Sequence, residues 1–119
     1  MKSSEFRDLI VWQRAMDLAE EVYSLVKFLP REETFSLSDQ IRRAAVSIPS
    51  NIAEGQGRMT AKEFIRFLSM ARGSLWELST QIELCERLRY LDKAQTQNAN
   101  KLILEVAKML NALSNAISD

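Results

Sequence analysis

Residues 40–58 read QIRRAAVSIPSNIAEGQGR and set one proline and two glycines beside an otherwise strongly helical pattern. A proline inside a helix removes a hydrogen-bond donor and crowds the carbonyl four residues back, at a cost of about 3 kcal/mol. Pro49 therefore kinks a helix or ends one. The apolar residues around it recur at helical spacing and include small alanines that allow close helix approach: Ile41, Ala44, Ala45, Ile48, Ile52. The stretch predicts a helix over about 38–54, capped by Ser36 or Ser38.

The residues that follow predict the next helix boundary. Gly55 and Gly57 are expected to end the helix, because glycine reaches the left-handed conformation without steric cost. Thr60 and Glu63 have the spacing of a capping box, which opens a helix over about 61–90. Gly73 lies within that helix at about 1 kcal/mol of propensity cost, which indicates close packing by a neighbouring element.

Two further helices complete the pattern. Apolar residues at three- and four-residue steps predict a helix over about 8–29, with Asp8 as its N-cap and Pro30 as its end. Asp92 is expected to cap a last helix over about 93–117. Four amphipathic helices with short links predict an all-α fold, an antiparallel up-down-up-down four-helix bundle.

Composition limits the possible chemistry. The chain has 119 residues, 46% of them hydrophobic and 27% charged, which predicts one globular domain over 1–119. It has no histidine and one cysteine, Cys85, so a zinc site, a Cys-His nucleophile or a His-containing di-iron site cannot form within the chain. We expect no enzyme activity, no metal and no cofactor, and an inert, buried Cys85. The apolar runs are too short for a membrane span and the N-terminus lacks a signal-peptide layout, which predicts a cytoplasmic protein.

The charges are unevenly distributed although the net charge is zero. Residues 40–72 carry six basic side chains against two acidic ones. Such a segment can contact phosphates, since each lysine or arginine near a nucleic-acid backbone releases counterions. The candidate nucleic-acid-binding residues are Arg42, Arg43, Arg58, Lys62 and Arg66. Charged residues at this spacing are more often a solvated helix face, and some could pair with acids of a neighbouring protomer.

A polar group surrounds Pro49. Ser47, Asn51 and Glu54 could belong to a ligand site, but a structural or assembly role is favoured, because serine and asparagine can take up backbone groups that Pro49 leaves unpaired. Asn51 or Glu54 could also bond to another helix or subunit. The predicted structural or assembly residues are Ser47, Pro49, Asn51, Glu54, Gly55 and Gly73. The tryptophans, Trp12 and Trp76, belong to apolar stripes and are expected to be core or interface anchors.

Four segments of the chain carry a family resemblance. They are QIRRAAVSIPSNIAEG at 40–55, LIVWQRAMDLAEEVY at 9–23, PREETFSL at 30–37 and EFIRFLSMARGSLWELSTQIELCERL at 63–88. Over residues 6 to about 91 the chain resembles the bacterial four-helix-bundle proteins encoded in intervening sequences of large-subunit ribosomal RNA genes. The resemblance implies a ring-like homopentamer. A related group, the accessory variability determinants of diversity-generating retroelements, binds nucleic acid and a reverse transcriptase.

This resemblance implies a binding or scaffolding role, and two functions stay open. In the first, a homo-oligomer displays the basic segment repeatedly and contacts RNA or DNA through weak contacts that add by multivalency. In the second, the oligomer is purely structural or recruits a protein partner such as a reverse transcriptase, without binding nucleic acid.

Overall fold

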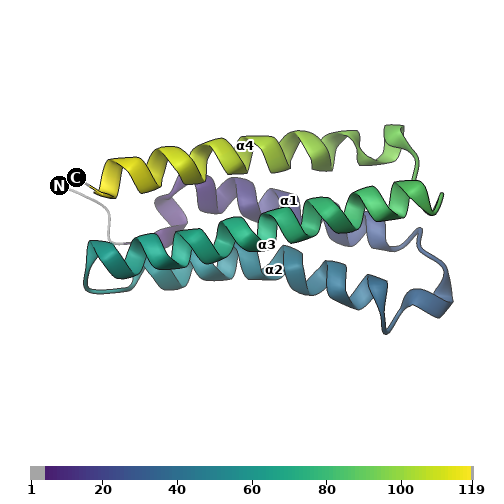
Figure 1. Ribbon diagram of the computed structural model, residues 1–119, viewed down its shortest axis with the longest axis horizontal. Helices are drawn as coiled ribbons and strands as arrows, with labels where there is room; N and C mark the ends of the chain where they lie inside the picture. Colours follow the sequence, from purple (N-terminus) through teal and green to yellow (C-terminus); the bar gives the residue numbers. More distant parts are fainter. Residues whose placement is uncertain (1–4, 119) are drawn as a thin grey trace.

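The structure, a computed structural model, describes residues 5–118 and places four long helices along one axis (Figure 1). Their bounds are Ile10–Val26 (α1), Leu37–Gln56 (α2), Ala61–Arg87 (α3) and Lys93–Ser118 (α4). Two short 3-10 turns, Phe6–Asp8 (η1) and Arg31–Glu33 (η2), precede α1 and α2. The predicted all-α fold with four helices is confirmed. Within the described chain, no helix is both long and apolar enough to cross a membrane.

Each helix packs against two others, which gives the bundle a single core. α2 packs on α1 and α3, while α4 packs on α3 and returns to α1. The interface between α2 and α3 is the most extensive of the four. Large side chains from every helix meet in the centre and are fully buried, among them Leu18, Ile48, Leu75, Leu78 and Leu110. Burial of such apolar faces is what holds four amphipathic helices together.

Two of the predicted helix caps are present. The Thr60 hydroxyl accepts a hydrogen bond from the Glu63 amide at 3.1 Å. Asp92 and Gln95 form a reciprocal pair, in which the Asp92 carboxylate accepts from the Gln95 amide at 2.8 Å and the Gln95 side chain accepts from the Asp92 amide at 2.9 Å. These bonds satisfy backbone donors that the first helical turn leaves free, and so fix where α3 and α4 begin.

The predicted cap of α1 is wrong, and the predicted cap of α2 is right in position but not in its hydrogen bond. Leu9 occupies the N-cap position of α1 without a side-chain hydrogen bond, and Asp8 belongs to η1. Ser36 holds the N-cap position of α2, but its hydroxyl donates to the Glu33 carboxylate at 2.9 Å instead of accepting from the helix. Glu33 also accepts from the Leu37 amide at 3.4 Å and thereby takes over the role expected of the serine.

The glycines act in part differently from their predicted roles. α2 continues through Gly55 to Gln56 and ends at its C-cap Gly57, as predicted for Gly57. The φ of Gly57 is −82°, so neither glycine is left-handed. Gly55 is buried, and a Cβ built on it would lie 2.7 Å from the Cβ of Phe67 in α3. Gly73 is exposed and a Cβ there would meet no atom within 4 Å, so the predicted close packing at Gly73 is wrong. The close approach is at Gly55.

Pro49 lies inside α2 without ending the helix, and the polar side chains around it bind neighbouring carbonyls. The Ser47 hydroxyl donates to the Ala44 carbonyl at 2.9 Å, and the Asn51 amide donates to the Ser47 carbonyl at 2.8 Å. Because Pro49 has no N–H to donate, the carbonyl that loses its helical hydrogen bond is that of Ala45, four residues back. The prediction that these side chains satisfy the groups left by Pro49 is therefore wrong. Both bonds stay within α2, so Asn51 does not reach another helix of the chain.

The turn between α3 and α4 places a non-glycine residue in the left-handed region. Arg89 has φ 65°, while its amide donates to the Glu86 carbonyl at 3.1 Å and the Tyr90 amide donates to the Cys85 carbonyl at 2.9 Å. This pair of bonds is the Schellman arrangement, in which the left-handed position favours glycine. An arginine there carries the Cβ strain of that conformation.

We expect the substitution Arg89→Gly to raise the free energy of unfolding by about 1 kcal/mol, because glycine adopts positive φ without that strain. Urea unfolding followed by circular dichroism measures the change. The matched control is Arg89→Ala, which removes the same charge but keeps a Cβ, and should stay within about 0.5 kcal/mol of the parent. Equal stabilisation by both substitutions would place the cause in the arginine side chain and not in the backbone.

Candidate functional site

The five residues of the predicted basic segment do not form one surface. Arg42 and Arg43 lie in the first half of α2, whereas Arg58, Lys62 and Arg66 lie at the α2–α3 turn and the start of α3. With a rise of 1.5 Å per residue, α2 separates the two groups by roughly 20 Å. The structure therefore brings together only the last three.

Most of these cations already have an acceptor in the same chain. The ion pairs are Arg43 with Asp39 at 3.0 Å, Arg58 with Glu54 at 2.7 Å and Arg66 with Glu63 at 3.0 Å. Arg42 donates to the Thr34 carbonyl at 3.2 Å. Each exposed pair contributes little to stability, but the adjacent carboxylate cancels most of the positive potential of its arginine. Glu54 thus pairs with Arg58 and not with another helix of the chain, and a bond to another subunit stays a prediction.

Two of the arginines also cover an aromatic ring. The guanidinium carbons of Arg58 and Arg66 lie 4.6 Å and 4.7 Å from the ring centroid of Phe67, which is only 5% exposed. This geometry is a cation–π contact. Sequence analysis missed it, because Arg58 reaches Phe67 only once the α2–α3 turn has folded. Phe67 is consequently not open for stacking by a ligand.

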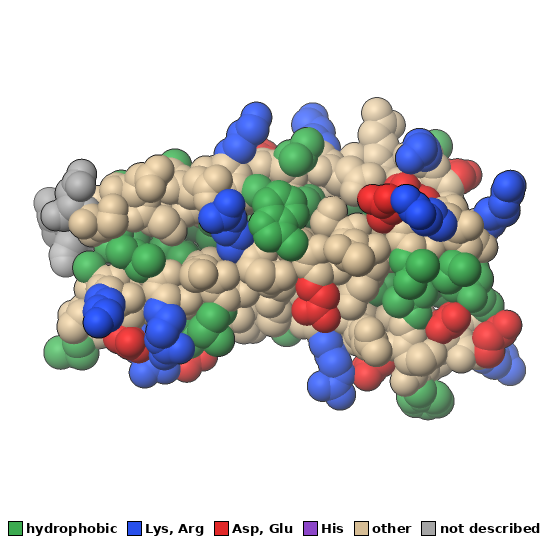
Figure 2. Space-filling view, in the orientation of Figure 1, with side chains coloured by type: hydrophobic (Ala, Val, Ile, Leu, Met, Phe, Trp, Pro, Cys, Tyr) green, Lys and Arg blue, Asp and Glu red, His purple; other side chains and the backbone are tan. Residues whose placement is uncertain are grey.

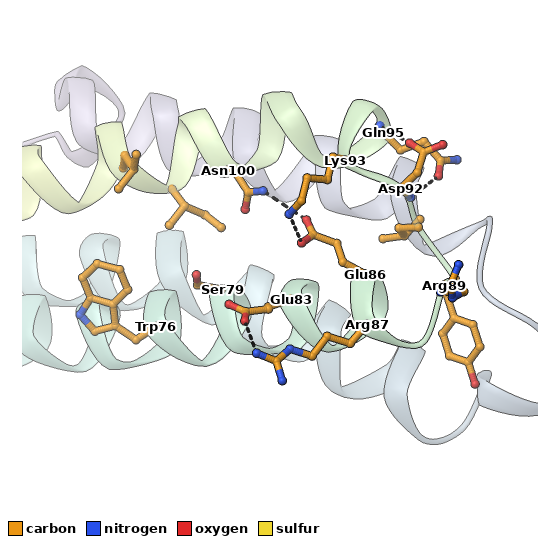
Figure 3. Close-up of a pocket in the computed structure, with 14 residues that line it drawn as sticks. Trp76, Ser79, Glu83, Glu86, Arg87, Arg89, Asp92, Lys93, Gln95 and Asn100 are labelled. Atoms are coloured by element: carbon orange, nitrogen blue, oxygen red, sulfur yellow. Dashed lines mark hydrogen bonds and ion pairs between the residues drawn. The ribbon is translucent and has the colours of Figure 1, made fainter.

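A groove of about 1070 Å³ lies between α3 and α4 (Figure 3). Its lining includes the buried Ile103 and Leu91 and the exposed side chains of Trp76 and Leu104. Trp76 is 44% exposed, so it is not a core residue. Sequence analysis missed this surface, because nothing local to either helix indicates which stripes face each other across the bundle.

A polar cluster around Glu86 lies further along the same groove, toward the turn that joins α3 and α4 (Figure 3). The Glu86 carboxylate accepts from the Thr96 hydroxyl at 2.6 Å, from Lys93 Nζ at 3.3 Å and from the Asn100 amide at 3.4 Å. The hydrogen bond from Thr96, followed by those from Lys93 and Asn100, lowers the pKa of Glu86 against the opposing effect of burial. The cluster joins α3 to α4 with its donors and acceptors satisfied, which is the arrangement of a structural contact.

Cys85 lies on the inner face of α3 and is fully buried, as predicted. Burial, with the nearby Glu33 and Glu86 carboxylates adding to it, raises the pKa of the Cys85 thiol to about 11. The thiolate is therefore scarce at neutral pH and the side chain is inert. Among residues 5–118, no group of three or more His, Cys, Asp and Glu side chains is placed to hold a metal ion.

The flank of α1 that faces away from α4 is apolar. Arg14 binds Glu105 at 3.4 Å and Glu21 accepts from Asn98 at 3.1 Å, which marks the flank of α1 that faces α4. Since residues three and four apart share a helix face, the opposite flank follows from the sequence. It consists of Trp12, Met16, Ala19 and Tyr23.

The flank of α2 that meets α1 continues this apolar surface. Gly55 lies against Phe67 and so marks the flank of α2 that faces α3. The opposite flank consists of Arg42, Val46, Pro49 and Ala53. We call these four residues, with Trp12, Met16, Ala19 and Tyr23, the α1/α2 stripe. It contains one charged residue among eight. Met16, Tyr23 and Val46 are 36–45% exposed, Pro49 is buried and the other four are half-buried.

Comparison with known proteins places this architecture in a family. A family model described as 23S rRNA-intervening sequence protein matches residues 7–112. Among solved structures, the chain is similar to a Bacteroides thetaiotaomicron protein of unknown function from the S23 ribosomal protein family, with a TM-score of 0.80 and 30% sequence identity over 87% of this chain and 97% of that chain. No curated protein matches the chain. Because the family model covers most of the sequence and the fold agrees, the chain belongs to the family of 23S rRNA-intervening sequence proteins.

Proposed function

We propose that the protein is a non-enzymatic scaffold that assembles with copies of itself in the cytoplasm and presents a repeated binding surface. The observation that carries this proposal is the α1/α2 stripe. Apolar residues scattered singly over a surface are ordinary, whereas a contiguous apolar stripe with few charges is typical of a surface that another protein covers. A second copy of the chain is the partner that the family resemblance favours.

The ring-like pentamer implied by that resemblance requires two different surfaces of each protomer to meet. A contact of this kind is heterologous, and it closes into a ring when the rotation between neighbours allows it. The α1/α2 stripe would be one of the two surfaces. Its apolar centre would supply the burial that a stable interface needs.

Two proposals for the ligand of the assembly follow from the sequence. Nucleic acid could bind Arg58, Lys62 and Arg66, repeated around the ring with Arg42 and Arg43 further along α2. Lys62 supports this, since it makes no ion pair within the described residues. The local ion pairs of the neighbouring arginines support the alternative, an oligomer that is structural or recruits a protein such as a reverse transcriptase.

Light scattering of the purified protein tests the assembly. We expect a mass several times the 13.6 kDa of one chain, and we expect Val46→Glu to reduce it to that of the monomer, because a charge in the stripe must be desolvated on assembly. Leu84→Glu is the matched control, since Leu84 is also 43% exposed but lies on α3 outside the stripe. A parent protein of 13.6 kDa would refute the proposal, as would a Val46→Glu variant of unchanged mass.

A further inference from the structure

Besides Lys62 at the start of α3, three cations on α3 and α4 have no partner in the described chain. Arg72, Lys101 and Lys108 are exposed and make neither an ion pair nor a hydrogen bond with residues 5–118. They differ in this from Arg58 and Arg66 of the predicted basic segment, each of which has a carboxylate beside it. Unpaired cations give the surface around them a positive electrostatic potential, which attracts a polyanion.

These cations surround the exposed apolar part of the α3/α4 groove. Arg72 precedes Trp76 by one helical turn, while Lys101 and Lys108 lie three and four residues on either side of Leu104. Figure 2 shows hydrophobic side chains in the middle of the face formed by α3 and α4, with Lys and Arg side chains to the left and above and Asp or Glu side chains below. We call Arg72, Trp76, Lys101, Leu104 and Lys108 the Trp76 surface.

The carboxylates of the same two helices are engaged elsewhere. Glu105 binds Arg14 of α1 at 3.4 Å, Glu83 binds Arg87 at 3.1 Å, and Glu77 accepts from Gln81 at 3.4 Å. Glu86 is held by Thr96 and its neighbours, and its side chain is 14% exposed. None of these carboxylates makes an ion pair with Arg72, Lys101 or Lys108.

We propose that the Trp76 surface binds single-stranded nucleic acid, with a base stacked on the Trp76 indole and phosphates bound by Arg72, Lys101 and Lys108. An aromatic side chain beside unpaired cations is the usual composition of a sequence-tolerant single-strand site, because every base has a π-face and every nucleotide a phosphate. A duplex offers only the phosphates to such a surface, since its bases are stacked on one another. The surface lies on the face opposite the α1/α2 stripe, so the stripe itself does not include it.

The test compares two triple substitutions that each remove three cations. Fluorescence anisotropy with labelled twelve-residue oligouridine and oligodeoxythymidine measures affinity from 50 to 200 mM salt, and these two probes distinguish RNA from DNA. Arg72→Ala, Lys101→Ala and Lys108→Ala together should weaken binding at least tenfold and remove most of a log–log salt slope of about −2. The second triple, Arg58→Ala, Lys62→Ala and Arg66→Ala, removes the alternative nucleic-acid site of the proposed function and decides between the two surfaces. If single strands bind at the Trp76 surface, it should weaken binding less than threefold.

The fluorescence of Trp76 reports base stacking separately from the electrostatic contribution of the three cations. Stacking of a base should quench the fluorescence of Trp76, so the quenching seen in the parent should be absent from Trp76→Phe, which keeps Trp12. Trp76→Ala should weaken binding about tenfold, while Trp76→Phe should restore part of the affinity. Thermal unfolding of each variant verifies that it remains folded, and light scattering shows whether assembly is intact, so failure of the scaffold proposal is recognised separately.

Several results would overturn the inference. They are undetectable binding of both oligonucleotides at 50 mM salt, larger losses in the Arg58–Lys62–Arg66 triple than in the Arg72–Lys101–Lys108 triple, or binding without quenching of Trp76. Equal affinity for an oligoglutamate peptide would also overturn it, since the surface would then recognise an acidic protein segment.

Discussion

Replacing Gly55 by alanine is expected to lower the free energy of unfolding by about 2 kcal/mol, although alanine is the better helix former. The added Cβ would lie 2.7 Å from the Cβ of Phe67 and 3.0 Å from a ring carbon of Phe64. A Cβ is fixed to its backbone, so the contact with Phe67 is relieved only if α2 and α3 move apart. Overpacking of this kind costs typically 1–3 kcal/mol, and here it spreads over the most extensive interface of the bundle.

Gly73→Ala is the matched control for this prediction. Gly73 also lies inside a long helix, but a Cβ there meets no atom within 4 Å. The substitution should raise the free energy of unfolding by about 1 kcal/mol through helix propensity alone. Urea unfolding of the two variants should thus give changes of opposite sign. Stabilisation by both would show that α3 can shift away from α2 at little cost.

The two glycines also illustrate how far the sequence predicts this fold. The helix bounds followed from apolar periodicity and from the caps Thr60 and Asp92, because both signals act within one or two turns. The role of a glycine depends instead on which atom of another helix lies opposite. Gly55 meets Phe67 only after the α2–α3 turn has formed, so its local sequence resembles a helix end.

The same distinction between local signals and contacts between helices applies to the candidate site. The pairing of Arg43 with Asp39 and of Arg58 with Glu54 could have been predicted, since each pair has the four-residue spacing that joins side chains on one helix face. That spacing would have weakened the prediction of a basic segment. The placement of Trp76 and Leu104 along one groove between α3 and α4 has no such local signal, because it depends on the register of two antiparallel helices.

Glu86→Ala is expected to lower the free energy of unfolding by about 2 kcal/mol at pH 7. The substitution leaves the hydroxyl of Thr96, which is fully buried, without its 2.6 Å acceptor. Hydrogen bonds to a charged group contribute about 1.5–3 kcal/mol each, and this carboxylate is well shielded from water. Glu83→Ala is the matched control on the same helix. Its ion pair with Arg87 is exposed, so its loss should cost at most about 1 kcal/mol.

The pH dependence of the free energy of unfolding distinguishes a contribution from the charge of Glu86 from a contribution of its packing. The folded protein holds the pKa of Glu86 below its ordinary value, so the unfolded chain takes up a proton first as the pH falls. The stabilisation is therefore complete above about pH 5 and is lost as the pH falls through the ordinary value near 4.3 toward the lowered folded pKa. Urea unfolding from pH 7 to pH 3 should accordingly show the gap between the parent and Glu86→Ala narrowing, because the variant lacks this titration. A gap that stays constant over that range would mean that the carboxylate acts through its packing and not through its charge.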